Sequence, residues 1–564
     1  MSVILSCARG HNASTTLMVD GKIIFYLEEE RLSRRKYDGA PLLGLLKAFD
    51  YVDTIDHLVI CHTHRHGPEL DWTGEDLYRG WVRKLSKSPN ENYQIHFIDT
   101  IHHELHASCG FLNSGFETAA CVIADGAGSF LQSDSFPSVG YEFETIFKAK
   151  YPLEFDTVYK HIGVKDPVGI LDLNGDGNFL VTEYPGNTKI YEAITEYCGF
   201  SSIDAGKTMG LSPYGKENLD LPNFYHEKWG NRDVFIPNYP NGATINFERY
   251  PILTEDIKEH KRGEYTQIQK DMAYAVQRDT ETRMIELIRK AHEETKENNI
   301  VVCGGYGLNC VANYKYWKEF PDLNIYCEPI SHDGGTSIGA AKYIYAKIND
   351  LESPMKPQTS IYYGPQYDVN KYEDYISDFD YVSTSYEEVA KLIRDGNIVT
   401  IFQGRSEGGP RALGNRSILF DPTIENGKDI VNKVKRREFF RPFACSILKE
   451  KVNEWFDLAG REESPHMMYA VNCLPGVEEK IPSVIHVDGT CRIQTVSEEQ
   501  NKHYYKLISE FEKLSGVPIL FNTSFNLGGD PLVETLEDAI NTLRKSDIEF
   551  LYLPEIQKLV KISN

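Results

Sequence analysis

Short runs of apolar residues separated by polar turns open the chain. Residues 3–7 are apolar, and the runs 15–19 and 22–27 flank Asp20-Gly21, a dipeptide typical of tight hairpin turns. A polar turn containing glycine, residues 9–14, separates the first two runs. This pattern predicts a buried strand, a glycine turn and a β-hairpin.

The same combination of strand and turn recurs further along the chain. The apolar run 119–124 leads into Asp125-Gly126, and the run 300–303 leads into Gly304-Gly305. Apolar residues recur at helical spacing over residues 265–296 and 335–348. Strands that end in glycine turns ahead of helices are typical of α/β layers, in which backbone N–H groups can approach a phosphate closely.

A change of composition divides the chain near residue 356. Residues 349–366 contain prolines at positions 354, 357 and 365, and beyond them the pattern predicts a helix over 367–395 and a strand over 398–402. We therefore predict two α/β domains, residues 1–356 and residues 357–564.

The composition is that of an acidic globular protein. Of the 564 residues, 41% are hydrophobic and 25% are charged, and the formal net charge is −23 at pH 7. No apolar run is long enough for a membrane span, and the N-terminus does not resemble a signal peptide. The 11 cysteines are scattered, which is typical of reduced thiols in a cytoplasmic protein. The acidic balance argues against broad, non-specific nucleic-acid binding.

The pair His102 and His106 is the first candidate for chemistry. On a helix the two imidazoles, four residues apart, share one face and suit a divalent transition metal. The HExxH pattern of zinc proteases is absent, so oxygen donors are needed, and Asp125 and Asp333 at strand ends are the candidates. His103 is interpreted as a bystander. Taken alone, two histidines on a helix are more often structural than metal-binding.

Two basic segments are candidates for anion binding. In residues 404–417 three arginines lie among four glycines after a predicted strand, which favours an anion site over a structural loop. The ending of a Walker loop is missing. In residues 435–444, Lys435, Arg437 and Arg441 accompany Phe and Pro anchors, and the alternative is a charge cluster at a helix end. Residues 486–492 and 521–526 add weaker signals.

Two further patterns resemble metal sites without the matching context. Residues 172–183 satisfy the spacing of an EF-hand loop, but nearby prolines argue against flanking helices, so we interpret them as a tight surface turn. His62, His64 and His66 alternate as strand ligands would, yet their segment is interpreted as a loop.

Together these segments resemble the carbamoyltransferase family that includes nodulation protein U and the cephem, novobiocin-type and tobramycin enzymes. The resemblance covers essentially the whole chain. The matching segments are residues 10–14, 28–31, 102–106, 204–215, 304–309, 404–417, 437–444 and 521–526.

The resemblance implies an actin-like (duplicated RNase H-like), metal-binding N-terminal domain and a YrdC-like α/β C-terminal domain. In such enzymes carbamoyl phosphate is cleaved in the C-terminal domain, and the carbamate reacts with ATP, bound with Mg²⁺, to give carbamoyl-adenylate and pyrophosphate. The N-terminal domain then transfers the carbamoyl group to a hydroxyl. The implied ion is iron(II) or another divalent metal.

The same resemblance assigns residues to each task. The implied metal ligands are His102, His106, Asp125 and Asp333. His11 would be the base beside the acceptor hydroxyl, with Lys36 as a second catalytic residue. The residues implied to bind carbamoyl phosphate and ATP are Arg411, Asn415, Arg416, Lys435, Arg441, Arg492 and Ser524. Gly304, Gly305 and Asn309 would lie near the adenosine of the intermediate.

The acceptor stays open at this point. An antibiotic, a sugar and a hydroxymethyl group on a DNA base are chemically equivalent candidates, and residues 147–183 do not match the family pattern. We expect no membrane association and leave a homodimer open. The alternatives are a threonylcarbamoyl-type tRNA modification enzyme and a non-catalytic, nucleotide-sensing actin-like protein.

Overall fold

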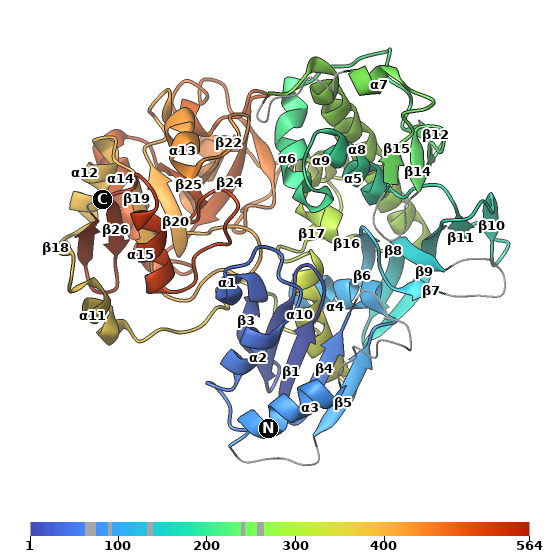
Figure 1. The fold of residues 1–564 in the computed structure, drawn as a ribbon, viewed down its shortest axis with the longest axis horizontal. Helices are drawn as coiled ribbons and strands as arrows, with labels where there is room; N and C mark the ends of the chain where they lie inside the picture. The colour runs from blue at the N-terminus through green and yellow to red at the C-terminus, as the bar shows by residue number, and fades with distance from the viewer. Residues whose placement is uncertain are drawn as a thin grey trace. The chain divides into compact units, whose positions relative to one another are not determined.

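The chain forms two compact units. The computed structural model describes residues 2–62, 75–87, 93–131, 139–237, 243–255 and 264–562. One unit comprises Met1–Ile24 with Gly39–Gln358, and the other comprises Phe25–Asp38 with Thr359–Asn564 (Figure 1). The division after Gln358 lies two residues from the predicted boundary. A single cut along the chain misses Phe25–Asp38, which groups with the C-terminal residues.

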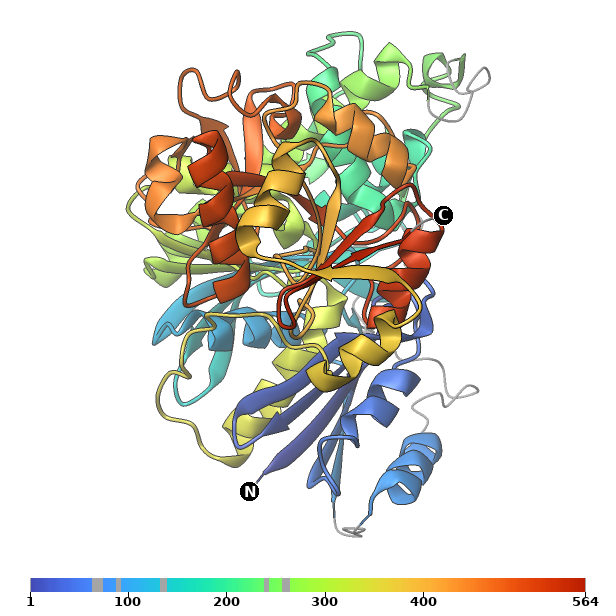
Figure 2. The ribbon, with the colours of Figure 1, turned by 90° about the vertical axis from the view of Figure 1, so that its left-hand side faces the viewer.

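The first sheet of the N-terminal unit has the order β3-β2-β1-β4-β5. Its strands are β1 (Val3–Ala8), β2 (Ser14–Val19), β3 (Lys22–Glu28), β4 (His57–Cys61) and β5 (Gln94–Ile98). β1 is antiparallel to β2 and parallel to β4, and β4 is parallel to β5. The predicted opening strand and the hairpin at Asp20-Gly21 are confirmed. The strands of this sheet, in blue, lie side by side in Figure 2.

The second sheet repeats this topology. Its order is β10-β11-β9-β8-β6-β16-β17, and β7 also pairs with β8. The strands are β6 (Thr118–Ala124), β7 (Phe130–Leu131), β8 (Gly140–Lys150), β9 (Glu154–Val164), β10 (Ile170–Asp172), β11 (Phe179–Thr182), β16 (Asn299–Cys303) and β17 (Asn324–Cys327).

The five strands β9-β8-β6-β16-β17 have the order and directions of the first sheet, because β6 and β8 are antiparallel, as are β8 and β9, whereas β6, β16 and β17 are parallel. A duplicated RNase H-like domain requires this repeat. The mixed α/β class is thereby confirmed.

Two helices pack against each other within this unit. α10 (Thr336–Ile348) lies on β1, β2 and β4 of the first sheet, while α4 (His102–Ser114) lies on β6, β8, β16 and β17 of the second. Their contact is close because Gly339 of α10 has no side chain: a Cβ there would lie 2.0 Å from the carbonyl oxygen of Leu105. This packing fixes the start of α4 relative to the start of α10.

Further helices belong to the N-terminal unit. The helices are α2 (Leu42–Ala48), α3 (Glu75–Leu85), α5 (Asn187–Tyr197), α6 (Ala205–Leu211), α7 (Ile252–Glu255), α8 (Gln267–Thr295) and α9 (Cys310–Glu319). The predicted helices over 265–296 and 335–348 correspond to α8 and α10. Within residues 172–183, the turn 173–178 connects β10 to β11, and Asp172 accepts hydrogen bonds from the backbone N–H groups of Asn174, Gly175 and Gly177. The interpretation as a tight turn is confirmed.

The C-terminal unit contains a ten-stranded mixed sheet of order β18-β27-β26-β19-β20-β25-β21-β24-β23-β22. The strands are β18 (Asp380–Ser383), β19 (Val399–Phe402), β20 (Arg416–Phe420), β21 (Ala444–Leu448), β22 (Phe456–Asp457), β23 (Ala470–Cys473), β24 (Thr490–Val496), β25 (Ile519–Ser524), β26 (Phe550–Leu553) and β27 (Lys558–Lys561). Its helices are α1 (Glu29–Ser33), α11 (Tyr372–Ile376), α12 (Tyr386–Arg394), α13 (Gly427–Lys435), α14 (Lys502–Ser515) and α15 (Leu536–Arg544). The YrdC-like identity of this unit stays a prediction.

The single helix predicted over 367–395 is wrong. The segment forms α11, the edge strand β18 and α12, because residues Asp380–Ser383 pair with β27 at the edge of the sheet. Ser385 then restarts a helix with a capping box to Glu388. A propensity pattern cannot show a pairing with residues about 180 positions away. Among the described residues no helix is long and apolar enough to cross a membrane.

The α4–α10 contact gives a first prediction. Gly339→Ala should lower the free energy of unfolding by about 1–3 kcal/mol, because the new methyl group meets a backbone carbonyl that cannot move without shifting α4. Gly80→Ala is the control, since nothing lies within 4 Å of a Cβ at that position in α3, and it should be neutral or slightly stabilising. Denaturant unfolding measures both, and equal stabilities of the two variants would contradict the close packing.

Candidate functional site

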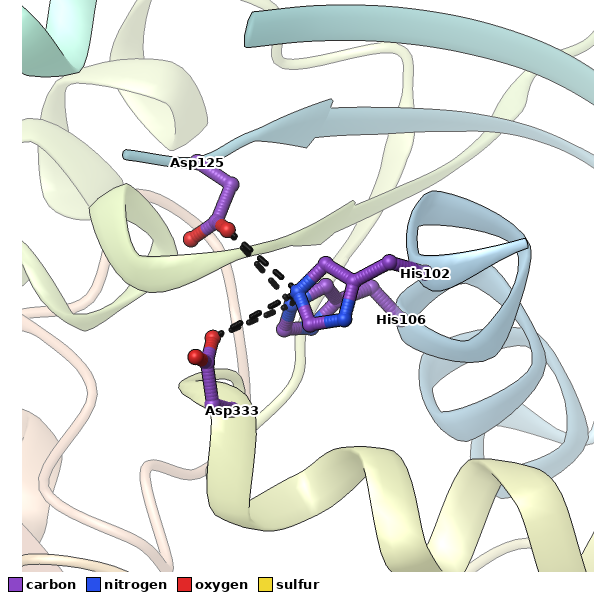
Figure 3. A group of neighbouring side chains, drawn as sticks. All are labelled: His102, His106, Asp125 and Asp333. Atoms are coloured by element: carbon purple, nitrogen blue, oxygen red, sulfur yellow. Dashed lines mark hydrogen bonds and ion pairs between the residues drawn. The ribbon is translucent and has the colours of Figure 1, made fainter. Parts of the chain in front are cut away.

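Four buried side chains from three separate parts of the fold meet in the N-terminal unit (Figure 3). His102 and His106 occupy the first turns of α4, Asp125 follows β6, and Asp333 begins the short turn before α10. One ligand atom from each residue lies within 4.8 Å of all the others. The helical spacing of the histidines and the position of Asp125 at a strand end are as predicted, whereas Asp333 lies six residues after the end of β17. The fold brings all four side chains together.

The distances between these atoms fit a metal ion. The Nε2 atoms of His102 and His106 are 3.0 Å apart, and Nε2 of His102 is 3.5 Å from a carboxylate oxygen of each aspartate. Nε2 of His106 lies 3.6 Å from Asp333 and 3.9 Å from Asp125. Bonds of about 2.1 Å to one ion place neighbouring ligand atoms roughly 3.0–3.4 Å apart. Imidazole with carboxylate is a donor set for divalent transition metals such as zinc or iron.

The charges of the group also call for a cation. Burial alone would lower the pKa of His102, but hydrogen bonds to Asp125 and Asp333 outweigh it and raise this pKa to about 10. Burial likewise raises the pKa of both carboxyl groups, yet the neighbouring histidines hold each pKa below its usual range. Two ionised carboxylates are therefore stable here only with positive charge between them, which a proton or a metal ion can supply.

The glycine turn after β16 lies against this group. The N–H of Gly305 donates to Oδ1 of Asp125 at 2.9 Å, and Gly304 has φ +88° with no room for a side chain beside the carbonyl of Ala124. Gly305, one of the residues predicted to lie near the adenosine, thus holds a candidate metal ligand. Asn309 caps α9 and hydrogen-bonds Gln277, so its side chain already has partners inside the protein.

The two predicted catalytic residues lie in different units. Nδ1 of His11 is 3.6 Å from Oδ2 of Asp333, and the His11 side chain is 49% exposed, so it combines contact with the candidate metal group and access to solvent. Lys36 lies in the segment that groups with the C-terminal unit, where its Nζ is 3.4 Å from Glu30.

In residues 404–417 the predicted anion-binding groups bond to the protein itself. Arg416 is fully buried, and its guanidinium donates to the carbonyl groups of Gln403, Gly404 and Glu534. Arg405 donates to two carbonyl groups of residues 363–364. These two arginines therefore hold the loop in place, and phosphate binding by Arg416 stays a prediction.

A protein carboxylate occupies the backbone donors of the same loop. Oε1 of the buried Glu407 accepts from the N–H groups of Leu413, Asn415 and Arg416 at 2.7, 2.8 and 3.2 Å. The glycine-rich loop does form an anion-binding nest, as its sequence suggests, but the anion is Glu407.

Asn415 and Arg411 are the other two residues of this loop that are predicted to bind carbamoyl phosphate or ATP. The side chain of Asn415 bonds to the carbonyl of Arg405 and accepts from Asn501. Arg411 is half-buried on the same loop.

A second group of basic side chains gathers elsewhere in the C-terminal unit. Nζ of Lys435 contacts Ser524 and lies 3.0 Å from Asn526. Burial lowers the pKa of Lys435 well below its ordinary value, and the positive charges of Arg437 and Arg441 lower it further.

Arg437 extends this group. Its pKa is lowered by burial and then by Arg441 and Arg492. We call Lys435, Arg437, Arg441, Arg492 and Ser524 the basic cluster. Mutual repulsion of its cations favours a polyanion at this place. The sequence already indicates Arg437 as an anion-binding candidate together with Lys435 and Arg441, although the resemblance does not assign it to carbamoyl phosphate or ATP.

His62 is described, whereas His64 and His66 lie outside the described residues. Among the described residues, the group of His102, His106, Asp125 and Asp333 is the metal-ligand cluster that the structure contains.

The chain is similar to proteins of one family along most of its length. Residues 90–342 match the model of the carbamoyltransferase N-terminus, and residues 390–558 match that of the carbamoyltransferase C-terminus. Nodulation protein NolNO of Sinorhizobium fredii is 30% identical, over 96% of this chain and 78% of that protein. An uncharacterized protein of Synechocystis is 29% identical, over 96% of this chain and 94% of its own.

A solved structure of full-length HypF in its phosphate- and nucleotide-bound form is 13% identical, over 62% of this chain and 55% of that chain, with a TM-score of 0.35. A likeness at that level does not define the fold.

The bonds of Arg416 give a second prediction. Arg416→Met should lower the free energy of unfolding by about 3 kcal/mol or more, because it leaves several buried carbonyl groups without donors. Lys391→Met is the control, since this exposed lysine pairs with Asp395 on the surface, and it should change the stability by about 1 kcal/mol or less. Denaturant unfolding is the measurement. A stable Arg416→Met protein that has lost only activity would instead indicate a ligand-binding role.

Proposed function

Because the chain belongs to the carbamoyltransferase family and carbamoylates a hydroxyl group of an acceptor, we propose that carbamoyl phosphate and ATP supply the carbamoyl group and that a buried metal centre serves the transfer. The observation that carries this proposal is the convergence of His102, His106, Asp125 and Asp333, with His11 beside them. The basic cluster in the other unit supports a separate activation step.

Activation is assigned to the basic cluster. Lys435, Arg441 and Arg492 bind the phosphates, whose negative charge offsets the repulsion among the cations gathered there. Hydrolysis of carbamoyl phosphate by a water molecule leaves carbamate and phosphate. The carbamate oxygen then attacks the α-phosphorus of ATP, and the bond from this phosphorus to the oxygen that bridges it to the β-phosphorus breaks. Carbamoyl-adenylate forms and pyrophosphate leaves.

Transfer is assigned to the N-terminal unit. His102, His106, Asp125 and Asp333 would hold the ion, which when bound polarises the carbamoyl oxygen. His11 takes the proton of the acceptor hydroxyl as its oxygen attacks the carbamoyl carbon. Asp333 orients His11, because its carboxylate lies 3.6 Å from Nδ1. AMP leaves as the carbamate ester forms.

The net charge of the protein favours one class of acceptor over another. A net charge of −23 repels phosphate backbones, so a neutral small molecule such as a sugar or an antibiotic fits better than a hydroxymethylated base in DNA. A screen with radiolabelled carbamoyl phosphate that includes hydroxymethylcytosine DNA separates these acceptors.

Pyrophosphate release tests the activation step. With ATP and carbamoyl phosphate but no acceptor, the protein should release pyrophosphate, and Arg441→Ala should slow this at least about 100-fold through loss of a phosphate-binding charge. Arg436→Ala is the matched control, because this exposed neighbour bonds to the carbonyl of Lys545 instead. Pyrophosphate release that requires threonine would overturn the proposal in favour of a threonylcarbamoyl-type tRNA enzyme.

Metal analysis tests the transfer site. His102→Ala should purify with little bound metal and should transfer no carbamoyl group to an acceptor, because one of two nitrogen ligands is lost. His57→Ala serves as control, since this half-buried histidine lies on β4 and contacts His96. Elemental analysis gives the content of iron and other divalent metals. Unchanged metal in His102→Ala would rule out this site.

A further inference from the structure

The two ring nitrogens of His106 have different neighbours. Nε2 faces His102 and the two aspartates, whereas Nδ1 lies 3.9 Å from Sγ of Cys303. Both residues are fully buried, so water does not reach Nδ1. A metal-bound histidine usually donates its second N–H to an oxygen atom, which fixes the ring and the tautomer. Here a thiol occupies that position.

Cys303 is itself held in place. It is the last residue of β16, which pairs with β6 on one side and β17 on the other. Its Sγ also lies 3.9 Å from the carbonyl oxygen of Ser331. A thiol has one weak donor and a weak acceptor, so Sγ can accept from Nδ1 of His106 while its own proton is directed to Ser331. The sulfur then accepts one hydrogen bond and donates one.

The neighbourhood of Cys303 reaches the other candidate ligands. Gly305, two residues further along the chain, donates its N–H to Asp125, and Ser331 lies two residues before Asp333. The end of β16 therefore touches His106 directly, Asp125 through one backbone hydrogen bond, and the segment that carries Asp333.

We propose that Cys303 is a positioning residue of the metal centre: its sulfur accepts the Nδ1 proton of His106 and so keeps Nε2 unprotonated and aimed at the ion. The inference rests on the proposed metal centre. No covalent or redox step is involved. Without the thiol, the His106 ring loses the contact that selects its tautomer and orientation. Part of the free energy of metal binding is then needed to fix the ring.

The test is the metal affinity of Cys303→Ala. We expect its affinity for Co²⁺, measured on the full chain after removal of metal and in competition with a chromophoric chelator, to fall about 10- to 100-fold. The visible absorption of bound Co²⁺ should also change, because it reports the ligand geometry. Cys303→Ser should lie between the wild-type protein and Cys303→Ala, because a hydroxyl keeps a donor and an acceptor but is shorter.

Cys121→Ala is the matched control. Cys121 is another fully buried cysteine on the adjacent strand β6, opposite Val301, and it packs in the same hydrophobic core as Cys303. Loss of packing alone should affect both alanine variants alike. We expect Cys121→Ala to bind Co²⁺ as the wild-type protein does and to show the same absorption spectrum.

The outcomes separate this inference from the proposed function. If the wild-type protein binds Co²⁺ and Cys303→Ala matches Cys121→Ala in affinity and spectrum, the positioning role is overturned and the metal centre stands. Absence of Co²⁺ binding by the wild-type protein overturns both. If Cys303→Ala does not fold, Cys303→Ser is compared with Cys303→Val, which has no hydrogen-bonding group at this position. A lower Co²⁺ affinity and a changed spectrum in Cys303→Val relative to Cys303→Ser support the positioning role, and equal affinity and spectrum in the two variants overturn it.

Discussion

The burial of two carboxylates beside two imidazoles is the constraint on which the N-terminal unit depends. Asp125 and Asp333 are each more than nine-tenths buried and lie within reach of the same pair of histidine nitrogens. Negative charge removed from water in this way is stable only when a cation or a bound proton accompanies it. The local structure around the group follows from that need, because strand ends, helix starts and backbone N–H groups all converge on it.

The repeated sheet explains how this convergence arises. β6 and β16 are parallel neighbours, so their C-terminal ends lie at the same edge of the second sheet and bring Asp125 close to Cys303 and Gly305. The packing of α4 against α10 adds the histidines and Asp333 from two helix starts. A site built on strand ends and packed helices is held more rigidly than one built on loops, which suits a metal centre that must keep its ligand geometry.

The C-terminal unit shows how a correct chemical signal can have an internal purpose. The glycine- and arginine-rich loop binds an anion, but that anion is the carboxylate of Glu407. Arg416 donates its hydrogen bonds to carbonyl groups of neighbouring segments. The cations of the basic cluster differ because they lie beside one another: burial lowers the pKa of Lys435 and of Arg437, and the neighbouring arginines lower both further. Substrate binding is therefore better sought where like charges are gathered than where a loop is rich in arginine and glycine.

Local spacing along the sequence determined the opening strand and hairpin, the long helices α8 and α10, and the pairing of His102 with His106, because these features depend on residues a few positions apart. The ordered motifs also determined the family. Only the tertiary structure decided which anion the glycine loop binds, that residues 380–383 form a strand, and that Phe25–Asp38 groups with the C-terminal residues. Each of these features depends either on partners more than a hundred residues away or on competition between a ligand and the protein's own groups. The spacing of nearby residues contains no information about distant partners or about such competition.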